Sequence, residues 1–153
     1  MSIIKVKDYF KKDNMDKRII EFNESSATVP LAAKALNCTE GEIAKSLTFM
    51  VNNKPIMIIV AGDKRIDNAK YKLEFKEKAK MLKYDEVEPL IGHSVGGVCP
   101  FAINENVIVY LDESLKKYQI VYPACGSSNS AIPLSISELE KYSNYLKWVD
   151  VSK

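Results

Sequence analysis

Near the middle of this chain, two asparagines separate a pair of apolar segments, and this arrangement limits the folds that the chain can adopt. Leu47 to Val51 and Pro55 to Ala61 are apolar and β-prone, and Asn52-Asn53 between them tolerates the positive φ that a tight turn requires. The two segments therefore predict a β-hairpin. Ile56 to Val60 do not alternate with polar residues, so we expect a central strand that is covered on both faces.

Helices are expected on both sides of this hairpin. Apolar residues at helical spacing predict a first helix from Ile3 to Lys12. The helix that starts after Thr39 should run from Glu40 through Lys45, which places Lys45 where a helix ends. Capping residues predict the starts of five helices, at Thr28 with Pro30 in the first turn, Thr39 with Glu42, Asp67, Asp85 with Glu88, and Ser135 with Glu138.

The remaining β-prone segments complete a picture of the fold class. Interleaved helices and strands without regular βαβ alternation predict an α+β fold with a mixed, mostly antiparallel β-sheet flanked by helices. A length of 153 residues suits one core, so we expect residues 1–153 to form a single domain. The further strand candidates are Arg18 to Phe22, Ala79 to Lys83, Val107 to Leu111, Gln119 to Ala124 and Ala131 to Leu134.

Composition excludes several classes of protein. No stretch approaches the roughly 20 apolar residues of a membrane helix, so we expect a cytoplasmic protein without membrane contact. Cys38, Cys99 and Cys125 have no paired spacing, and His93 is the only histidine. We therefore expect neither a metal nor a cofactor.

Positive charge is concentrated in one segment, although the net charge is only +2. Between Lys64 and Lys83 there are eight cations and only three acids, which are Asp67, Glu74 and Glu77. A solvated helix face is the plain interpretation, and contact with a tRNA backbone is the functional one. The cations are Lys64, Arg65, Lys70, Lys72, Lys76, Lys78, Lys80 and Lys83.

Two loops contain residues that suit ligand binding. Gly92, Gly96 and Gly97 lie within the loop from Gly92 to Phe101, and closely spaced glycines let backbone N–H groups surround an anion or oxyanion. The segment from Ala124 to Asn129 again offers glycine with hydroxyl and amide donors. Ordinary turns explain both loops equally well. The glycines match neither a dinucleotide-binding nor a Walker motif.

A few side chains are candidates for chemistry. Lys45 has small and apolar neighbours, where its cation is suited to a phosphate or a developing oxyanion; a surface lysine is the alternative. His93 is near Cys99 in sequence, but a loop histidine and an inert buried thiol explain them. No Gly-x-Ser-x-Gly or His-Glu-x-x-His motif is present. The residues alone indicate a ligand-binding α+β domain.

From about Ala27 to Asn144 the order of segments resembles the YbaK and prolyl-tRNA-synthetase-associated domain family. Each segment alone is weak evidence for the family, but their order along the chain is specific to it. They are Thr28-Val29 with Ala32-Ala33-Lys34-Ala35-Leu36, then Ile43-Ala44-Lys45-Ser46-Leu47, Ile59-Val60-Ala61-Gly62-Asp63-Lys64-Arg65, Gly92 to Phe101, and Gly126 to Leu139.

The resemblance implies an aminoacyl-tRNA deacylase that hydrolyses mischarged tRNA in trans. Lys45 matches the family's functional lysine, thought to hold the terminal phosphate of the tRNA. The glycine loop matches the family loop whose backbone donors hold the aminoacyl carbonyl and the adenosine. The residues expected to bind substrate are Gly92, His93, Val95, Gly96, Gly97, Pro100, Gly126, Ser127 and Asn129.

The resemblance also implies a mechanism and partners. Water, or the substrate's own thiol, would be the nucleophile with help from the ribose 2′-hydroxyl, without a metal. The expected ligand is the acceptor end of a mischarged tRNA, such as tRNA for proline carrying cysteine, alanine or another small amino acid, and prolyl-tRNA synthetase is a candidate partner. Ala27 and Val95 depart from the family, where many relatives have histidine and proline.

Two other functions fit the same residues. A non-catalytic module that binds tRNA, a nucleotide or a synthetase would use the same loops without turnover. A small-molecule esterase would act on simple esters independently of RNA, which the Lys-rich segment disfavours.

Overall fold

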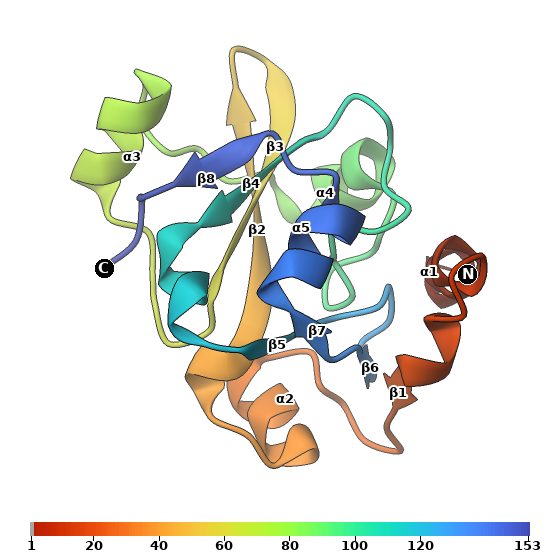
Figure 1. Ribbon diagram of the computed structural model, residues 1–153. Coiled ribbons are helices and arrows are strands. Elements are labelled where there is room, and N and C mark those ends of the chain that lie inside the picture. Colours follow the sequence, from red (N-terminus) through yellow and green to blue (C-terminus); the bar gives the residue numbers. More distant parts are fainter. Residues whose placement is uncertain (1) are drawn as a thin grey trace.

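The computed structural model describes residues 2–153, and its central element is a six-stranded mixed sheet (Figure 1). The strand order is β7-β5-β2-β3-β4-β8. The strands are β2 (Ile43–Val51), β3 (Lys54–Ala61), β4 (Ile108–Asp112), β5 (Ile120–Pro123), β7 (Leu134–Ser135) and β8 (Lys147–Val149), and a separate ladder pairs β1 (Ile20–Glu21) with β6 (Ser130–Ala131).

The mixed α+β sheet is confirmed, with one difference in its strand directions. The β2–β3 and β5–β7 pairs are antiparallel, and the β2–β5, β3–β4 and β4–β8 pairs are parallel. Antiparallel contacts therefore do not predominate among the strand neighbours of this sheet. The reason is that helical segments between β3 and β4, and between β7 and β8, return the chain to the same direction.

The hairpin at the centre of the sheet is confirmed. β2 and β3 pair in register from Ala44 with Ala61 to Val51 with Lys54. Asn52 and Asn53 form the turn with φ angles of 51° and 62°. Every β3 residue after Lys54 is buried, as expected for a strand between two neighbours with both faces covered.

Residues 2–153 form five α-helices around the sheet, and most of them start at the predicted capping residues. Thr28 accepts a hydrogen bond from Leu31 N–H, Asp67 accepts from Ala69 and Lys70 N–H, and Ser135 forms a capping box with Glu138. The α-helices are α1 (Ser2–Lys11), α2 (Val29–Leu36), α3 (Asn68–Phe75), α4 (Tyr84–Ile91) and α5 (Ile136–Ser143), and the 3-10 turns are η1 (Asp16–Arg18), η2 (Glu40–Glu42) and η3 (Glu113–Lys117).

Three local predictions were wrong. The capping box of Thr39 and Glu42 exists, but it closes only the turn η2, and β2 begins at Ile43, so Lys45 lies inside a strand rather than at a helix end. Helix α4 begins two residues early, where Glu86 accepts from Lys83 N–H. The segment 79–83 forms only an isolated bridge to β2 instead of a strand.

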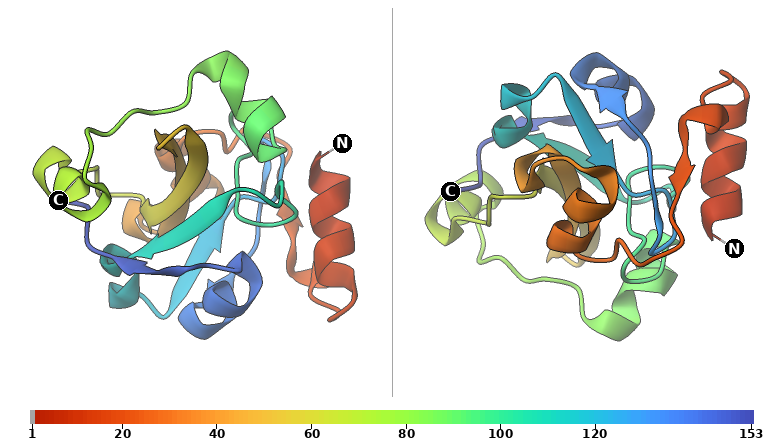
Figure 2. Two further views of the ribbon diagram at one scale, coloured as in Figure 1. Left: turned by 90° about the horizontal axis from the view of Figure 1, so that it is seen from above. Right: turned by 90° about the horizontal axis from the view of Figure 1, so that it is seen from below.

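Two clusters of apolar side chains pack on opposite faces of the sheet. One cluster contains Ile58 with Tyr71 of α3, and the larger one contains Ile59 with Phe10 of α1 and Leu139 of α5. Figure 2 shows α1 and α3 at opposite ends of the molecule, with an extended segment joining α3 to α4. Among residues 2–153, no helix is long and apolar enough to cross a membrane.

Candidate functional site

A cavity of about 400 Å³ opens beside β2. Most of its lining is apolar, and the polar residues that line it include several with hydroxyl groups and Lys45. Its walls come from five separate parts of the chain, within residues 26–32, 43–48, 81–87, 95–98 and 122–131.

The cavity exists because the edge of β2 is only partly paired. Near its start β2 pairs with β5 at Ile43 and Ala44. Further along, Thr48 O accepts from Leu82 N–H and Met50 N–H donates to Lys80 O. Alternate residues of a strand direct their N–H and C=O groups to the same edge, so those of Ser46 face the gap between these two pairings.

Ser46 also presents an unused hydroxyl at this gap. Its Oγ is buried and has no hydrogen-bond partner within residues 2–153, and the residue lines the cavity. A buried hydroxyl without a partner costs free energy, on the order of 1–3 kcal/mol. A polar ligand in the cavity would remove that cost.

Lys45 is a charged residue of the cavity lining. The residue is half-buried on β2, opposite Val60, and its Nζ donates to the carbonyl oxygens of Gly62, at 3.4 Å, and Lys64. Burial lowers the pKa of Lys45, and the nearby carboxylate of Asp63 partly offsets that effect. An ammonium has three N–H groups, so one remains for a ligand oxygen.

The glycine loop reaches the cavity through two of its residues. Val95, which is 48% exposed, and Gly96 both line it. Gly96 has a φ of 98°, and a Cβ there would lie 3.5 Å from the Cβ atoms of Ala27 and Ser128. Ala27 also lines the cavity. The two positions at which the chain departs from the resembled family, Ala27 and Val95, are therefore cavity residues.

The other three glycines of the predicted site do not line the cavity. Gly97 is buried against the backbone of Gly126 and Ser127, where a Cβ would approach within 2.6 Å. Gly92 ends α4 with a φ of 105°, and its carbonyl accepts from Lys5 Nζ at 2.9 Å. Gly126 packs against the backbone of Ser2. Their positions serve the packing of the loops on each other and on α1.

His93, Cys99 and Pro100 are buried away from the cavity. His93 Nε2 donates to the carbonyl of Phe101 at 2.6 Å, and Cys99 Sγ lies 3.4 Å from the same nitrogen. Burial lowers the pKa of His93 and raises the pKa of Cys99 to about 12. Pro100 lines a second, smaller cavity beside Tyr9. The thiol is neutral and inaccessible, as an inert cysteine would be.

Ser127 and Asn129 stabilise the loop between β5 and β6 instead of facing the cavity. Ser127 Oγ donates to Asn129 Oδ1 at 2.9 Å and lies 2.7 Å from Ser130 Oγ. Asn129 Nδ2 donates to the carbonyl of Phe22. These bonds hold the segment before α2 against this loop and so place Ala27 and Thr28 beside Gly96.

Several cavity residues were not anticipated from the sequence. Strand pairing brings Ser46 and Thr48 to the cavity through β2, and β5 brings Tyr122. Met81 lies within the Lys-rich segment 64–83, and Tyr84 directly follows it. Two large apolar side chains among so many charges were the feature of the sequence that could have indicated these residues. Within residues 2–153 no three His, Cys, Asp or Glu side chains gather as metal ligands would; a metal-free reaction stays a prediction.

Comparison with known proteins gives this geometry a context. The family model described as "Aminoacyl-tRNA editing domain" matches residues 23–142. The chain is 46% identical over its whole length to the uncharacterised Bacillus subtilis protein YwhH, covering 98% of it. It is 24% identical, over 74% of its length and 71% of the relative's, to the Enterococcus faecalis protein named "Putative Cys-tRNA(Pro)/Cys-tRNA(Cys) deacylase EbsC".

A solved structure agrees over nearly the whole chain. It is described as that of "a putative trans-editing enzyme for prolyl tRNA synthetase". The TM-score is 0.88 at 26% identity, and the match covers 99% of this chain and 97% of the other. The similarity therefore includes α1 and β8, which lie outside the residues matched by the family model.

Proposed function

Because the chain belongs to the aminoacyl-tRNA editing domain family, we propose that it is a deacylase that hydrolyses, in trans, the ester between a wrong amino acid and the terminal adenosine of a tRNA. The observation that carries the proposal is the placement of Lys45. Lys45 lines a largely apolar cavity, next to Ser46, whose Oγ has no hydrogen-bond partner within residues 2–153. We place the activity in the cytoplasm, where charged tRNA is used.

Lys45 binds and orients the substrate in this proposal. Two of its N–H groups are held by the carbonyls of Gly62 and Lys64, and the third contacts the phosphate that precedes the terminal adenosine. Because the side chain is already fixed, little rotamer entropy is lost when the phosphate binds. The ester is thereby held at a set distance from the cavity wall.

The donors for the developing oxyanion come from main chain and hydroxyl groups. Ser46 offers its N–H and its unpartnered Oγ, and Gly96 offers backbone that no side chain obstructs. Donors fixed before the reaction stabilise a tetrahedral oxyanion by about 3–4 kcal/mol each. No cysteine or histidine is among the described residues that line the cavity, which supports water or a substrate group as the nucleophile.

The cavity favours a small, uncharged amino acid. Val29, Ile43, Leu47, Val87 and Val98 supply apolar wall, and a charged side chain against them would lose hydration without a partner. The names of the Enterococcus relative and of the structural neighbour support cysteine as the amino acid, and tRNA for proline, with prolyl-tRNA synthetase as a candidate partner.

The test is release of amino acid from a panel of charged tRNAs, chiefly tRNA for proline carrying proline, alanine, cysteine, serine or 2-aminobutyrate. We expect selective release by the wild type. Lys45→Met keeps the apolar stem and removes the cation, and it should lower the rate on the order of a hundredfold. Lys45→Arg, which keeps the charge, should retain more activity than Lys45→Met.

Each variant is first compared with the wild type by thermal unfolding, so that loss of fold is not mistaken for loss of chemistry. Normal turnover by a folded Lys45→Met protein would refute the role of Lys45. No release from any charged tRNA, with tRNA binding retained, would instead indicate a non-catalytic binding module.

A further inference from the structure

We propose that the strip formed by Lys80, Met81, Lys83 and Tyr84, at the lip of the cavity, holds the single-stranded 3′ end of the RNA substrate. The inference rests on the proposed function, since it identifies the surface that would guide a charged 3′ end to Lys45. Tyr84 is 81% exposed and Met81 is 57% exposed, and both line the cavity. Large apolar groups left in solvent at a cavity mouth indicate a binding surface.

The strip is exposed although its backbone is fixed. Leu82 N–H donates to Thr48 O at 3.1 Å, and Met50 N–H donates to Lys80 O at 2.9 Å. The side chain of Leu82 is only 8% exposed and packs into the larger core cluster. Because the chain is extended here, the neighbours of Leu82 on either side face outward. The exposure of Met81 and Lys83 therefore follows from register and not from a loose loop.

The chemistry of the strip is that of a surface for single-stranded nucleic acid. Such surfaces combine an aromatic ring on which a base stacks with cations that follow the phosphates. Tyr84 supplies the ring. Lys80 and Lys83 are exposed, and neither forms an ion pair among residues 2–153. The cations are therefore available to an anionic ligand.

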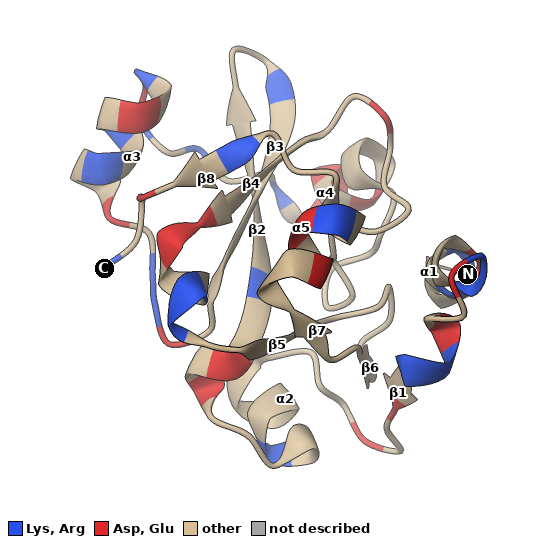
Figure 3. Cartoon of the chain, viewed as in Figure 1, with Lys and Arg blue, Asp and Glu red and all other residues tan. Residues whose placement is uncertain are grey.

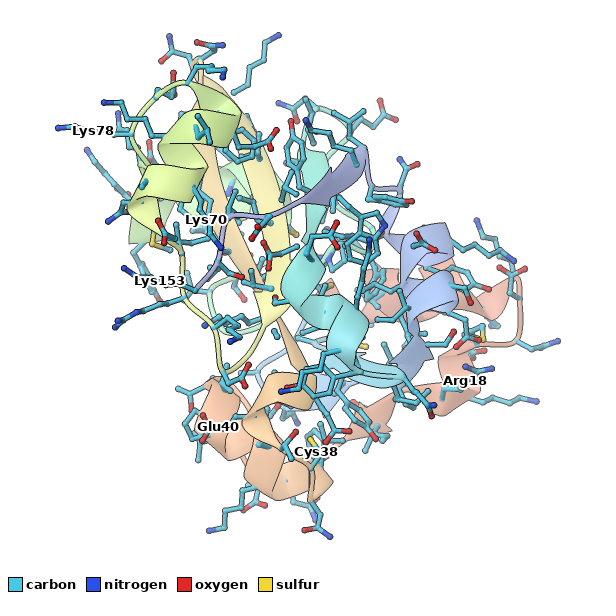
Figure 4. All side chains as sticks on the ribbon, turned by 60° about the vertical axis from the view of Figure 1, so that its left-hand side comes forward. Arg18, Cys38, Glu40, Lys70, Lys78 and Lys153 are labelled. Atoms are coloured by element: carbon cyan, nitrogen blue, oxygen red, sulfur yellow. The ribbon has the colours of Figure 1, made fainter. Side chains whose placement is uncertain are left out.

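Several other charged groups of residues 64–86 have partners of their own or lie outside the strip. Lys70 pairs with Asp150, and Lys147 pairs with Glu74. Glu86 accepts from the backbone N–H of Lys83, which leaves Asp85 as the free acid in the first turn of α4. Figure 3 shows acidic and basic bands alternating over α3, and Figure 4 shows Lys78 projecting from the molecule near that helix.

The position of the strip relative to Lys45 suits an RNA end that enters the cavity. The strip is bonded to β2 at Thr48, three residues beyond Lys45, which corresponds to about 10 Å along a strand. A 3′ strand lying across Tyr84 would place its last phosphate and ester on the Lys45 side of the cavity. A base stacked on Tyr84 would then be one that precedes the terminal adenosine.

The test is binding of an uncharged RNA oligonucleotide that ends in CCA, measured by fluorescence anisotropy over a range of salt concentrations. Tyr84→Ala should weaken binding roughly ten- to a hundredfold, and Tyr84→Phe, which keeps the ring, should restore most of it. The double variant Lys80→Gln/Lys83→Gln should lower the slope of log affinity against log salt by about 1.4, since each phosphate contact on a single strand contributes about 0.7.

A matched control removes two exposed lysines elsewhere. Lys11→Gln/Lys17→Gln changes the net charge equally, on residues that do not line the cavity, and its salt slope should stay that of the wild type. Unchanged binding by Tyr84→Ala, or an equal loss in the control, overturns the proposal. So does a wild type that binds no RNA, which would leave the strip to a protein partner.

Uncharged RNA makes the two hypotheses separable. A wild type that binds the oligonucleotide through Tyr84 but releases no amino acid would support the strip and refute the deacylase. Selective release of amino acid from mischarged tRNA, at the same rate in the wild type and in Tyr84→Ala, would support the deacylase and refute the strip.

Discussion

Lys45 combines two requirements that oppose each other. A lysine that is partly removed from water loses hydration of its charge, which lowers its pKa. The carbonyls of Gly62 and Lys64 and the carboxylate of Asp63 favour the charged form. The side chain is therefore kept in place as a cation, but its pKa lies closer to neutral pH than that of a fully solvated lysine.

This balance predicts a pH dependence for the reaction. If the cation is required, the enzymatic rate should be constant below the pKa of Lys45 and fall as the pH rises through it, at a lower pH than the ordinary lysine value of 10.5 would give. Arginine stays charged throughout, so the rate of Lys45→Arg should not show this fall. The measurement is deacylation at increasing alkaline pH, corrected for spontaneous ester hydrolysis. Parallel profiles for both proteins would contradict a role for the Lys45 charge.

Residue type alone does not distinguish a glycine that lines the cavity from a glycine that is required for packing. The clustering of the glycines indicated a backbone cradle, but only Gly96 lines the cavity. Gly97 is a glycine because the backbone of Gly126 and Ser127 leaves no room for a Cβ. A bulky residue at Gly97 would thus act on folding before it acts on substrate. Sequence cannot separate these cases, because both require the same missing side chain.

At the level of elements, α1 connects parts of the chain that form the rear of the site. Its Phe10 is fully buried, with its ring centroid 4.8 Å from that of Phe101 and 5.1 Å from that of Tyr142. Lys5 bonds to the carbonyl of Gly92, and Ser2 packs on Gly126. The helix thus supports both loops that carry the predicted substrate residues.

Loss of the Phe10 ring should therefore destabilise the whole fold. Phe10→Ala is expected to lower the free energy of unfolding by about 3–5 kcal/mol, and Phe10→Leu by much less, because leucine fills most of the volume. Chemical denaturation gives both values. A loss below about 1 kcal/mol for Phe10→Ala would show that α1 is a peripheral addition, independent of the core.

The helix starts that have side-chain caps were predictable from the sequence, and the exceptions have physical causes. The capping box at Thr39 indicated a helix from Glu40 through Lys45, yet the apolar and β-branched residues after Glu42 favour a strand, and pairing with β3 decides the outcome. Lys83 carries no capping signal, so the start of α4 was misplaced. β8 was missed because three residues are too few to show alternation.

At the scale of the whole molecule, the cavity is a product of topology. Lys45 and Gly96 are far apart in sequence, and they line the same cavity because β2 pairs with β5 on one stretch of its edge and with the segment 80–82 on the next. Local patterns give no information about such an unpaired gap. The family resemblance indicated Lys45, but Ser46, Thr48 and Tyr84 required the assembled sheet.

A single domain for residues 1–153 stays a prediction, and β3 provides its test. Ile58 and Ile59 are neighbours on this strand and fully buried, but they belong to clusters on opposite faces of the sheet. If one cooperative unit spans both faces, Ile58→Val and Ile59→Val should each cost about 0.5–1.5 kcal/mol and shift the same transition.

Two probes make that prediction decisive. Trp148 is the only tryptophan, and its Nε1 donates to Glu140 at 2.9 Å, so its fluorescence reports on the β8 and α5 region. Far-UV circular dichroism reports on all elements. Coincident denaturation curves from both probes, in the wild type and in both variants, are expected for one cooperative domain. Separate midpoints, with Ile58→Val moving one and Ile59→Val the other, would show that the two faces of the sheet unfold independently.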